Sequence, residues 1–303
     1  MKWLLAGASG FLGTALRERL ADRGDEVVRL VRREPATSHE LPWDPAAGVL
    51  DPGGFDGVDA VVNLCGVGVA DRPWTRSRRE AIRSSRVDPT ATLARGIASL
   101  ESRPVLVQAA GVAIYGTAWS DQPSTEDSPP AEDYLAQVVV SWEGAARPAI
   151  DAGGRVVSLR TSPVLGPGGG SFRPMRLAWS VGAGAVLGDG RQRMPMIALE
   201  DYLRALLWAA ETSDASGPYN LTLPEPTTNR EFSDELARAM HRPRLLAAPA
   251  PVLRAALGEL AEQLLGDMYV LPARLTAAGF TFTAPDVRAL VVSALSRSVS
   301  EPA

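Results

Sequence analysis

Lysine is nearly absent from this sequence. Lysine and arginine together number 31, and Lys2 is the single lysine. A Schiff-base lysine, a phosphate-binding P-loop and a Tyr-x-x-x-Lys catalytic pair each need a lysine beyond the first strand. Arginine does not replace it as a base, because the guanidinium keeps its proton at physiological pH. The sequence therefore excludes these three kinds of site.

Histidine and cysteine are also scarce, with two histidines and Cys65 as the single cysteine. The common zinc sites use four cysteine and histidine ligands, so no metal site is expected. One cysteine excludes an internal disulfide and, with no secretory leader at the N-terminus, favours the cytoplasm. The longest apolar runs are shorter than the ~18 residues of a membrane helix. The net charge of −4 does not favour nucleic acid, so neither nucleic-acid nor membrane binding is expected.

Apolar runs of strand length alternate with segments of helical periodicity over the first half of the chain. The predicted strands are Lys2–Ala6, Glu26–Val31, Val58–Leu64, Val105–Ala110 and Arg155–Arg160, and the predicted helices are Phe11–Arg23, Ser85–Leu100 and Gln137–Ala152. Strand–helix–strand repetition with right-handed crossovers predicts an α/β fold with a doubly wound parallel sheet.

The composition of the sequence changes near Gly166, where glycine-rich and proline-rich segments begin. We predict a nucleotide-binding domain over residues 1–165 and 196–223. Residues 166–195 and 224–303 are expected to form a smaller C-terminal substrate domain. Within the second part, helices are predicted over Asn229–Met240 and near Val252–Leu265.

Three glycines, Gly7, Gly10 and Gly13, stand between the first strand and the first helix. The first allows a tight turn, the second lets the backbone approach a pyrophosphate, and the third lets the helix pack closely on the sheet. The helix N-terminus offers free N–H groups to the phosphates. We therefore expect a dinucleotide against Gly7 to Gly13, with Ser9, Phe11 and Leu12 in the same loop. A tight turn with small packing residues is the alternative.

The second strand ends at Arg32 and Arg33, about 20 residues after the glycines. Arginine at this position suits the 2′-phosphate of NADP, whereas an acidic residue would suit NAD, and Glu34 keeps NAD open. A third run of interest, Leu64, Cys65 and Gly66, follows a buried strand. Gly66 would let the backbone approach the ribose or adenine of the cofactor. No chemical role is expected for Cys65.

The chain resembles the extended short-chain dehydrogenase/reductases in several motifs. They are Gly7–Gly13, Asn63–Gly66, Tyr115-Gly116, Trp142-Glu143, Arg160, Pro163–Pro167 and Asn220. More closely, it resembles an atypical epimerase-like branch known as NAD-dependent epimerase/dehydratases, in Trp43-Asp44-Pro45, Arg72-x-Trp74-Thr75, Ser85-Arg86, Leu165–Gly170, Leu271–Leu275 and Ala278–Phe282. The resemblance implies a Rossmann domain of the extended type, a small C-terminal domain and a substrate cleft. It also implies that Arg86 and Pro163 lie near the cofactor.

The parent superfamily uses a tyrosine and a lysine to move protons, and this chain departs from it. The family spacing places Leu135 at the tyrosine position and Val139 at the lysine position. Tyr134 and Tyr115 remain as candidate catalytic residues, and local packing of each ring is the alternative. Without a neighbouring lysine, a phenol with a pKa near 10 is a poor base at neutral pH.

Six arginines lie between Arg72 and Arg86, mostly three or four residues apart. A solvated helix face is the default interpretation of such a run, with Arg86 as the exception. The expected function is that of an NADP(H)-binding, epimerase-like oxidoreductase for a small polar carbonyl or nucleotide-sugar-like substrate. A non-catalytic NADP(H)-binding sensor or regulatory protein is the alternative, and a homodimer stays open.

Overall fold

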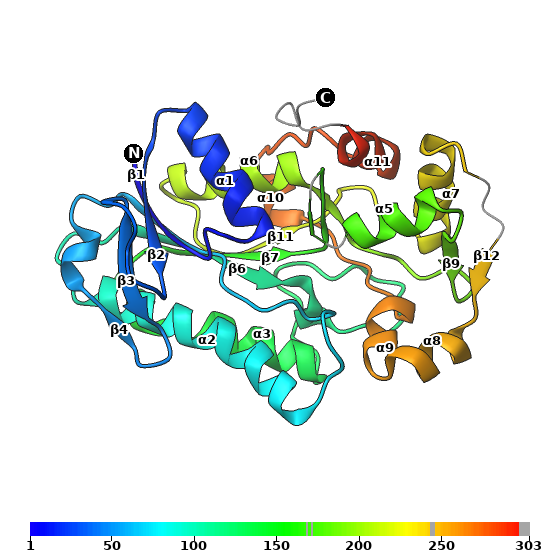
Figure 1. Cartoon of the computed structure of the whole chain (residues 1–303), viewed down its shortest axis with the longest axis horizontal. Helices are drawn as coiled ribbons and strands as arrows, with labels where there is room; N and C mark the ends of the chain where they lie inside the picture. Colours follow the sequence, from blue (N-terminus) through cyan, green and yellow to red (C-terminus); the bar gives the residue numbers. More distant parts are fainter. Residues whose placement is uncertain (168, 171, 243–245, 297–303) are drawn as a thin grey trace. The chain divides into compact units, whose positions relative to one another are not determined.

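The computed structural model describes residues 1–167, 169–170, 172–242 and 246–296 (Figure 1). They divide into two compact units, which are treated separately. The first unit comprises Met1–Ile114, Tyr134–Arg160 and Leu203–Pro218, and the second comprises Tyr115–Asp133, Thr161–Tyr202 and Tyr219–Ala303. Within the described residues, none of the helices combines the length and the apolar composition that a membrane crossing requires.

The main sheet has eight strands in the order β11-β7-β6-β5-β1-β2-β3-β4. Their bounds are β1 Lys2–Ala6, β2 Glu26–Val31, β3 Glu40–Asp44, β4 Val49–Leu50, β5 Ala60–Asn63, β6 Val105–Gly111, β7 Val156–Thr161 and β11 Gly217–Leu221. The strands from β6 through β5, β1 and β2 to β3 run parallel, and β4 pairs antiparallel with β3. The predicted doubly wound parallel sheet is confirmed.

Helices cover both faces of this sheet. Figure 1 shows α1 (Phe11–Asp22) and α6 (Leu199–Glu211) on one face, with α2 (Arg76–Ala98) and α3 (Tyr134–Gly144) on the other. The core strands are apolar because both faces are covered, and Trp3, Leu4, Leu5 and Ala6 of β1 are at most 1% exposed. This packing fixes the carboxyl ends of β1, β2, β3 and β5, where the functional site lies.

Two predicted helices have different bounds in the structure. α2 begins at Arg76 and not at Ser85, because Thr75 caps it by accepting a hydrogen bond of 3.2 Å from the N–H of Arg78. The first turns of α2 are polar, so they lack the apolar periodicity by which a helix is predicted from sequence. The predicted helix Gln137–Ala152 is divided into α3 and the short α4 (Arg147–Asp151), which carries a proline in its first turn, where it has no N–H to donate.

The second unit contains two small parallel sheets. β8 (Val164–Leu165) pairs with β10 (Ile197–Ala198), and β9 (Ala185–Leu187) pairs with β12 (Leu246–Ala248). Its helices are α5 Phe172–Ser180, α7 Asn229–Ala239, α8 Ala250–Leu257, α9 Leu260–Leu265, α10 Ala273–Ala277 and α11 Val287–Leu295. Residues 196–223 were predicted to belong to the nucleotide-binding domain, and the strands of this segment pair with different sheets, β11 with the main sheet and β10 with β8.

One hydrophobic core joins distant segments of the second unit. It includes Phe172 and Met196 together with Phe232, Leu236 and Leu290. The fully buried Asp201 accepts three hydrogen bonds of 2.7–2.9 Å from the N–H and hydroxyl of Thr283 and the N–H of Ala284. The segment from Thr283 to Leu295 is therefore an integral part of this unit.

Candidate functional site

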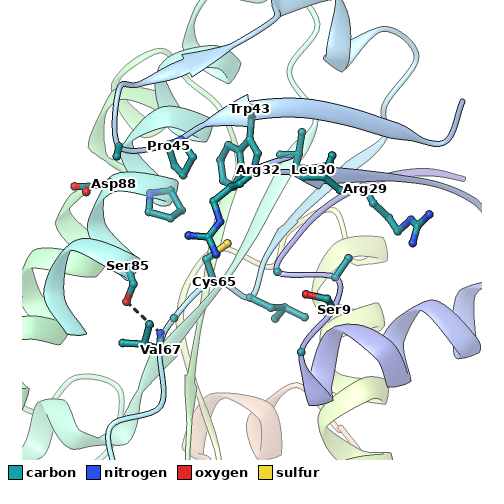
Figure 2. A pocket seen from close by; sticks show the side chains of 18 of the residues that line it. Ser9, Arg29, Leu30, Arg32, Trp43, Pro45, Cys65, Val67, Ser85 and Asp88 are labelled. Carbon is teal, nitrogen blue, oxygen red and sulfur yellow. Dashed lines mark hydrogen bonds between the residues drawn. The ribbon is translucent and has the colours of Figure 1, made fainter. Parts of the chain in front are cut away.

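A pocket of about 750 Å³ opens at the carboxyl ends of the parallel strands of the first unit (Figure 2). Pockets of roughly 300–1,000 Å³ are typical of small-molecule and cofactor sites. Its walls are 7–10 after β1, 17 on α1, 29–33 at the end of β2, 40, 43, 45 and 46 in and after β3, 64–67 after β5, and 81, 84, 85, 88 and 89 on α2. The predicted residues Gly7, Ser9, Gly10, Arg32, Arg33, Leu64, Cys65 and Gly66 are among them.

The three glycines of the loop differ in the room that the structure leaves for a side chain. Gly7 has a φ of +79°, and a Cβ there would lie 2.7 Å from the carbonyl carbon of Leu64. A Cβ on Gly13 would lie 2.3 Å from the carbonyl oxygen of Gly7. Gly10 has an ordinary φ of −76°, and the nearest atom to an added Cβ is the oxygen of Gly7 at 3.6 Å. The described residues therefore explain Gly7 and Gly13 and leave Gly10 without a packing reason.

Gly10 is also the residue before the first turn of α1, and no side chain caps this helix end. The first N–H groups of a helix have no partner within the helix, and its dipole is positive at this end. Phe11 and Leu12 form that first turn, and Gly13 follows them. These three residues, predicted as part of the site, are not in the pocket lining.

The loop after β5 is held in place from α2. The N–H of Val67 donates a hydrogen bond of 3.1 Å to the hydroxyl of Ser85, and the N–H of Cys65 donates to the side chain of Asn63 at 3.1 Å (Figure 2). Burial raises the pKa of the Cys65 thiol to about 12. Cys65 is therefore protonated at neutral pH and lines the pocket as an apolar side chain.

Arg86 lies behind this loop. Its guanidinium donates hydrogen bonds to the carbonyl oxygens of Val67 at 3.0 Å and Ile82 at 2.9 Å, and it lies 5.3 Å from the centre of the Trp142 ring. A Cβ on Gly66 would approach its carbon Cζ to 3.1 Å. Burial lowers the pKa of Arg86 to about 10, so the side chain stays charged at neutral pH. The structure places Arg86 under the pocket wall and not in the lining.

The remaining predicted residues are not among those that line the pocket. Pro163 belongs to the second unit, where its carbonyl accepts a hydrogen bond of 3.2 Å from Ile197. The hydroxyl of Tyr134 donates to the carbonyl of Arg79 at 2.7 Å, and the hydroxyl of Tyr115 donates to Asn220 at 2.8 Å. Burial also raises the pKa of Tyr134. In the structure, both phenols donate to protein acceptors.

Several lining residues escaped the sequence prediction. Trp43 and Pro45 line the pocket at the end of β3, and Asp88 and Pro89 line it from α2. The motif Trp43-Asp44-Pro45 suits either a wall beside the adenine or a turn before Pro45. Asp44 does serve a turn, because its carboxylate accepts hydrogen bonds of 3.0 and 3.1 Å from the N–H groups of residues 46 and 47. Its two neighbours face the pocket, so the motif serves both purposes.

Comparisons with known proteins agree with this architecture. The sequence matches the NAD dependent epimerase/dehydratase family over residues 3–222 and a domain of unknown function (DUF1731) over residues 248–291. An epimerase family protein of Mycobacterium bovis is 45% identical over 279 residues, which cover 92% of each chain.

Two solved structures are similar along nearly the whole chain. The human epimerase family protein SDR39U1, solved with NADPH, has a TM-score of 0.88 and 32% identity and covers 97% of this chain and 99% of its own. A nucleoside-diphosphate sugar epimerase from Corynebacterium glutamicum has a TM-score of 0.80 and 31% identity over 97% of this chain and 58% of its own. The resemblance seen in the motifs is confirmed, and the chain belongs to the NAD-dependent epimerase/dehydratase family.

Proposed function

We propose that this protein binds NADP(H) in the pocket of its first unit and is an epimerase-like oxidoreductase. The observation that carries the proposal is Gly10, a glycine on the pocket wall that neither φ nor packing requires. A bare Cα at this position is explained by the close approach of a ligand to the backbone. The human relative solved with NADPH supports the same cofactor, and NAD remains the alternative. The single cysteine supports a cytoplasmic location.

The residues present fit a phosphorylated dinucleotide. The uncapped start of α1 offers backbone N–H groups to a pyrophosphate, and Gly7 to Gly10 form the pocket wall beside it. An arginine at the end of β2 supplies the positive charge that a 2′-phosphate needs. The residues Leu64 to Gly66 and Trp43 provide apolar walls for the remainder. The nicotinamide, when bound, supplies hydride transfer, and the chain positions it and limits the access of water.

We assign the substrate to the smaller C-terminal domain, residues 166–195 and 224–303, and its class to small polar carbonyl or nucleotide-sugar-like compounds. The sugar epimerase from Corynebacterium glutamicum supports this class. Tyr134 and Tyr115 are the proposed proton-transfer residues. Each hydroxyl would have to exchange its present hydrogen bond, to Arg79 or Asn220, for one to the substrate.

A second function, an NADP(H)-binding sensor without turnover, is favoured by a different observation. The positions that carry the tyrosine and lysine in the parent superfamily hold Leu135 and Val139, which are 7% and 4% exposed. No ionisable group stands at either position. Such a protein would bind NADP(H) without transferring a hydride, and it would pass on the bound state through a homodimer or another partner.

Calorimetric titration with NADPH tests the cofactor site. Gly10→Ala is expected to weaken binding at least tenfold at an unchanged melting temperature, since about 1.4 kcal/mol of lost contact has this effect. Gly144→Ala is the matched control, because no atom lies within 4 Å of a Cβ at that glycine. Equal NADPH affinity in Gly10→Ala and wild type would contradict the proposal. NADPH oxidation with a panel of carbonyl compounds, lost in Gly10→Asp, then separates the oxidoreductase from the sensor.

A further inference from the structure

Two consecutive arginines at the end of β2 have different partners. Arg32 lines the pocket, and Figure 2 shows its guanidinium extending toward Cys65. Among the described residues, none accepts a hydrogen bond from Arg32 or forms an ion pair with it. Arg33 donates hydrogen bonds of 2.8 and 2.9 Å to the two oxygens of the Glu40 carboxylate. Identical neighbours therefore differ in the charge that they can offer to a ligand.

Glu40 is the cause of this difference. Its side chain is 2% exposed, whereas that of Arg33 is 58% exposed. The same carboxylate accepts a hydrogen bond of 2.7 Å from the N–H of Ala36 and pairs with Arg29 at 2.9 Å. The hydrogen bonds from Arg33 hold the pKa of Glu40 at about 2. The carboxylate is thus ionised at neutral pH, and moving Arg33 to a ligand would break a two-pronged, charge-assisted pair.

A phosphate is bound best by guanidinium N–H groups that are not already committed to another anion. Arg32 meets this condition and Arg33 does not. The proposed NADP(H) site already assigns the 2′-phosphate to an arginine at the end of β2. Resting on that site, we propose that Glu40 is a positioning residue, which holds Arg33 away from the phosphate and leaves Arg32 to bind it. Arg33 and Ala36 then fasten the loop between β2 and β3 to Glu40, which fixes the backbone from which Arg32 projects.

The test compares the ratio of NADPH to NADH affinity in the wild type, Arg32→Gln and Arg33→Gln by calorimetric titration. Losing a hydrogen bond to a charged group should lower this ratio about tenfold to hundredfold in Arg32→Gln. NADH affinity should be retained, which shows that the pocket is intact. Arg33→Gln should keep a ratio close to that of the wild type, although its melting temperature falls because Glu40 loses a partner.

The positioning role of Glu40 has its own readout. Glutamine at position 40 still accepts from Ala36 but no longer forms the ion pairs, so Arg33 becomes available. Adding Glu40→Gln to Arg32→Gln should therefore restore part of the preference for NADPH. A purely structural role would produce no such rescue, and its absence in a folded double variant overturns the assignment for Glu40.

The outcomes separate this inference from the proposed function. If Arg33→Gln removes the NADPH preference and Arg32→Gln does not, or if neither does, the inference is wrong while NADP(H) binding stands. If the wild type binds NADH as tightly as NADPH, the choice of NADP fails, and the inference fails with it. If the wild type binds neither dinucleotide, the proposed cofactor site itself is wrong.

Discussion

The hydroxyl of Tyr134 donates a hydrogen bond of 2.7 Å to the carbonyl oxygen of Arg79, whose guanidinium lies 4.7 Å from the centre of the same ring. Trp74 meets this ring edge-on, with ring centres 5.4 Å apart. The tyrosine thus joins the start of α3 to the first turns of α2. This contact makes a role in packing directly testable against the proposed role in proton transfer.

Tyr134→Phe is expected to destabilise the fold by about 0.5–1.5 kcal/mol, the net contribution of one hydrogen bond. The affinity for NADPH should not change, because Tyr134 does not line the pocket. Urea unfolding and calorimetric titration measure the two quantities. A lost turnover of carbonyl substrates at unchanged NADPH affinity would support the proposed proton transfer by Tyr134, whereas unchanged stability would contradict its role in packing.

Gly13→Ala should have the opposite profile to Gly10→Ala. A Cβ on Gly13 would lie 2.3 Å from the oxygen of Gly7 and 2.8 Å from the Cα of Ala8, and both atoms are main chain. Overpacking of this kind costs about 1–3 kcal/mol or more. Urea unfolding should detect this loss in Gly13→Ala and no comparable loss in Gly10→Ala. Similar stabilities of the two variants would contradict the packing reason given for Gly13.

Acid should weaken the loop between β2 and β3 through Glu40. The hydrogen bonds from Arg33 and Ala36 lower the pKa of Glu40 from an ordinary 4.5 to about 2. A lowered pKa stabilises the folded state fully above the unfolded value, and this stability is lost as the pH falls from about 4.5 toward 2. The melting temperature of the wild type should therefore fall more steeply with acid than that of Glu40→Gln.

The control for this pH series is Glu80→Gln, which removes an exposed carboxylate that pairs with Arg83 on the surface of α2. Its melting temperature should follow the wild-type curve, since exposed ion pairs contribute little. Parallel curves for all three proteins would show that Glu40 is not ionised against Arg33 as the structure indicates.

Arg86→Gln should affect both dinucleotides alike. The substitution removes a charge-assisted hydrogen bond to the partly buried carbonyl of Val67, which costs about 1.5–3 kcal/mol. The wall formed by Gly66 and Val67 is then less well fixed, so NADPH and NADH should both bind more weakly with an unchanged ratio. Arg83→Gln, on the same helix and 46% exposed, is the control. A change in the ratio would mean that Arg86 contacts the phosphate itself.

The glycine loop was predictable from the sequence because its causes are local. The bounds Lys2–Ala6 and Glu26–Val31 follow from short apolar runs, and Gly7 marks the turn that ends the first of them. β3 was missed, since Glu40–Asp44 contains a proline and a buried carboxylate and lacks a clear alternation. It exists because it pairs with β2, and pairing between strands is not visible in a single sequence.

The same limit applied to the two arginines of the site. The sequence placed both Arg32 and Arg33 at the end of a strand, where either would suit a phosphate. Only the partner seven residues later in the chain distinguishes them, because Glu40 is buried beside Arg33. Arg86 was named correctly as a residue of interest, but its hydrogen bonds to the loop carbonyls depend on how α2 packs.

The attachment of Thr283 and Ala284 to Asp201 bears on how genes of this family can be recombined. The first family match ends at residue 222, which invites an exchange of everything downstream as a module. Such a chimera would leave a fully buried carboxylate unpaired wherever the incoming segment does not bring equivalent donors to Asp201, and it would replace the part of the core to which Phe232 and Leu290 contribute. Donor and recipient must therefore be matched at these contacts, and a graft chosen only at the family boundary would misfold.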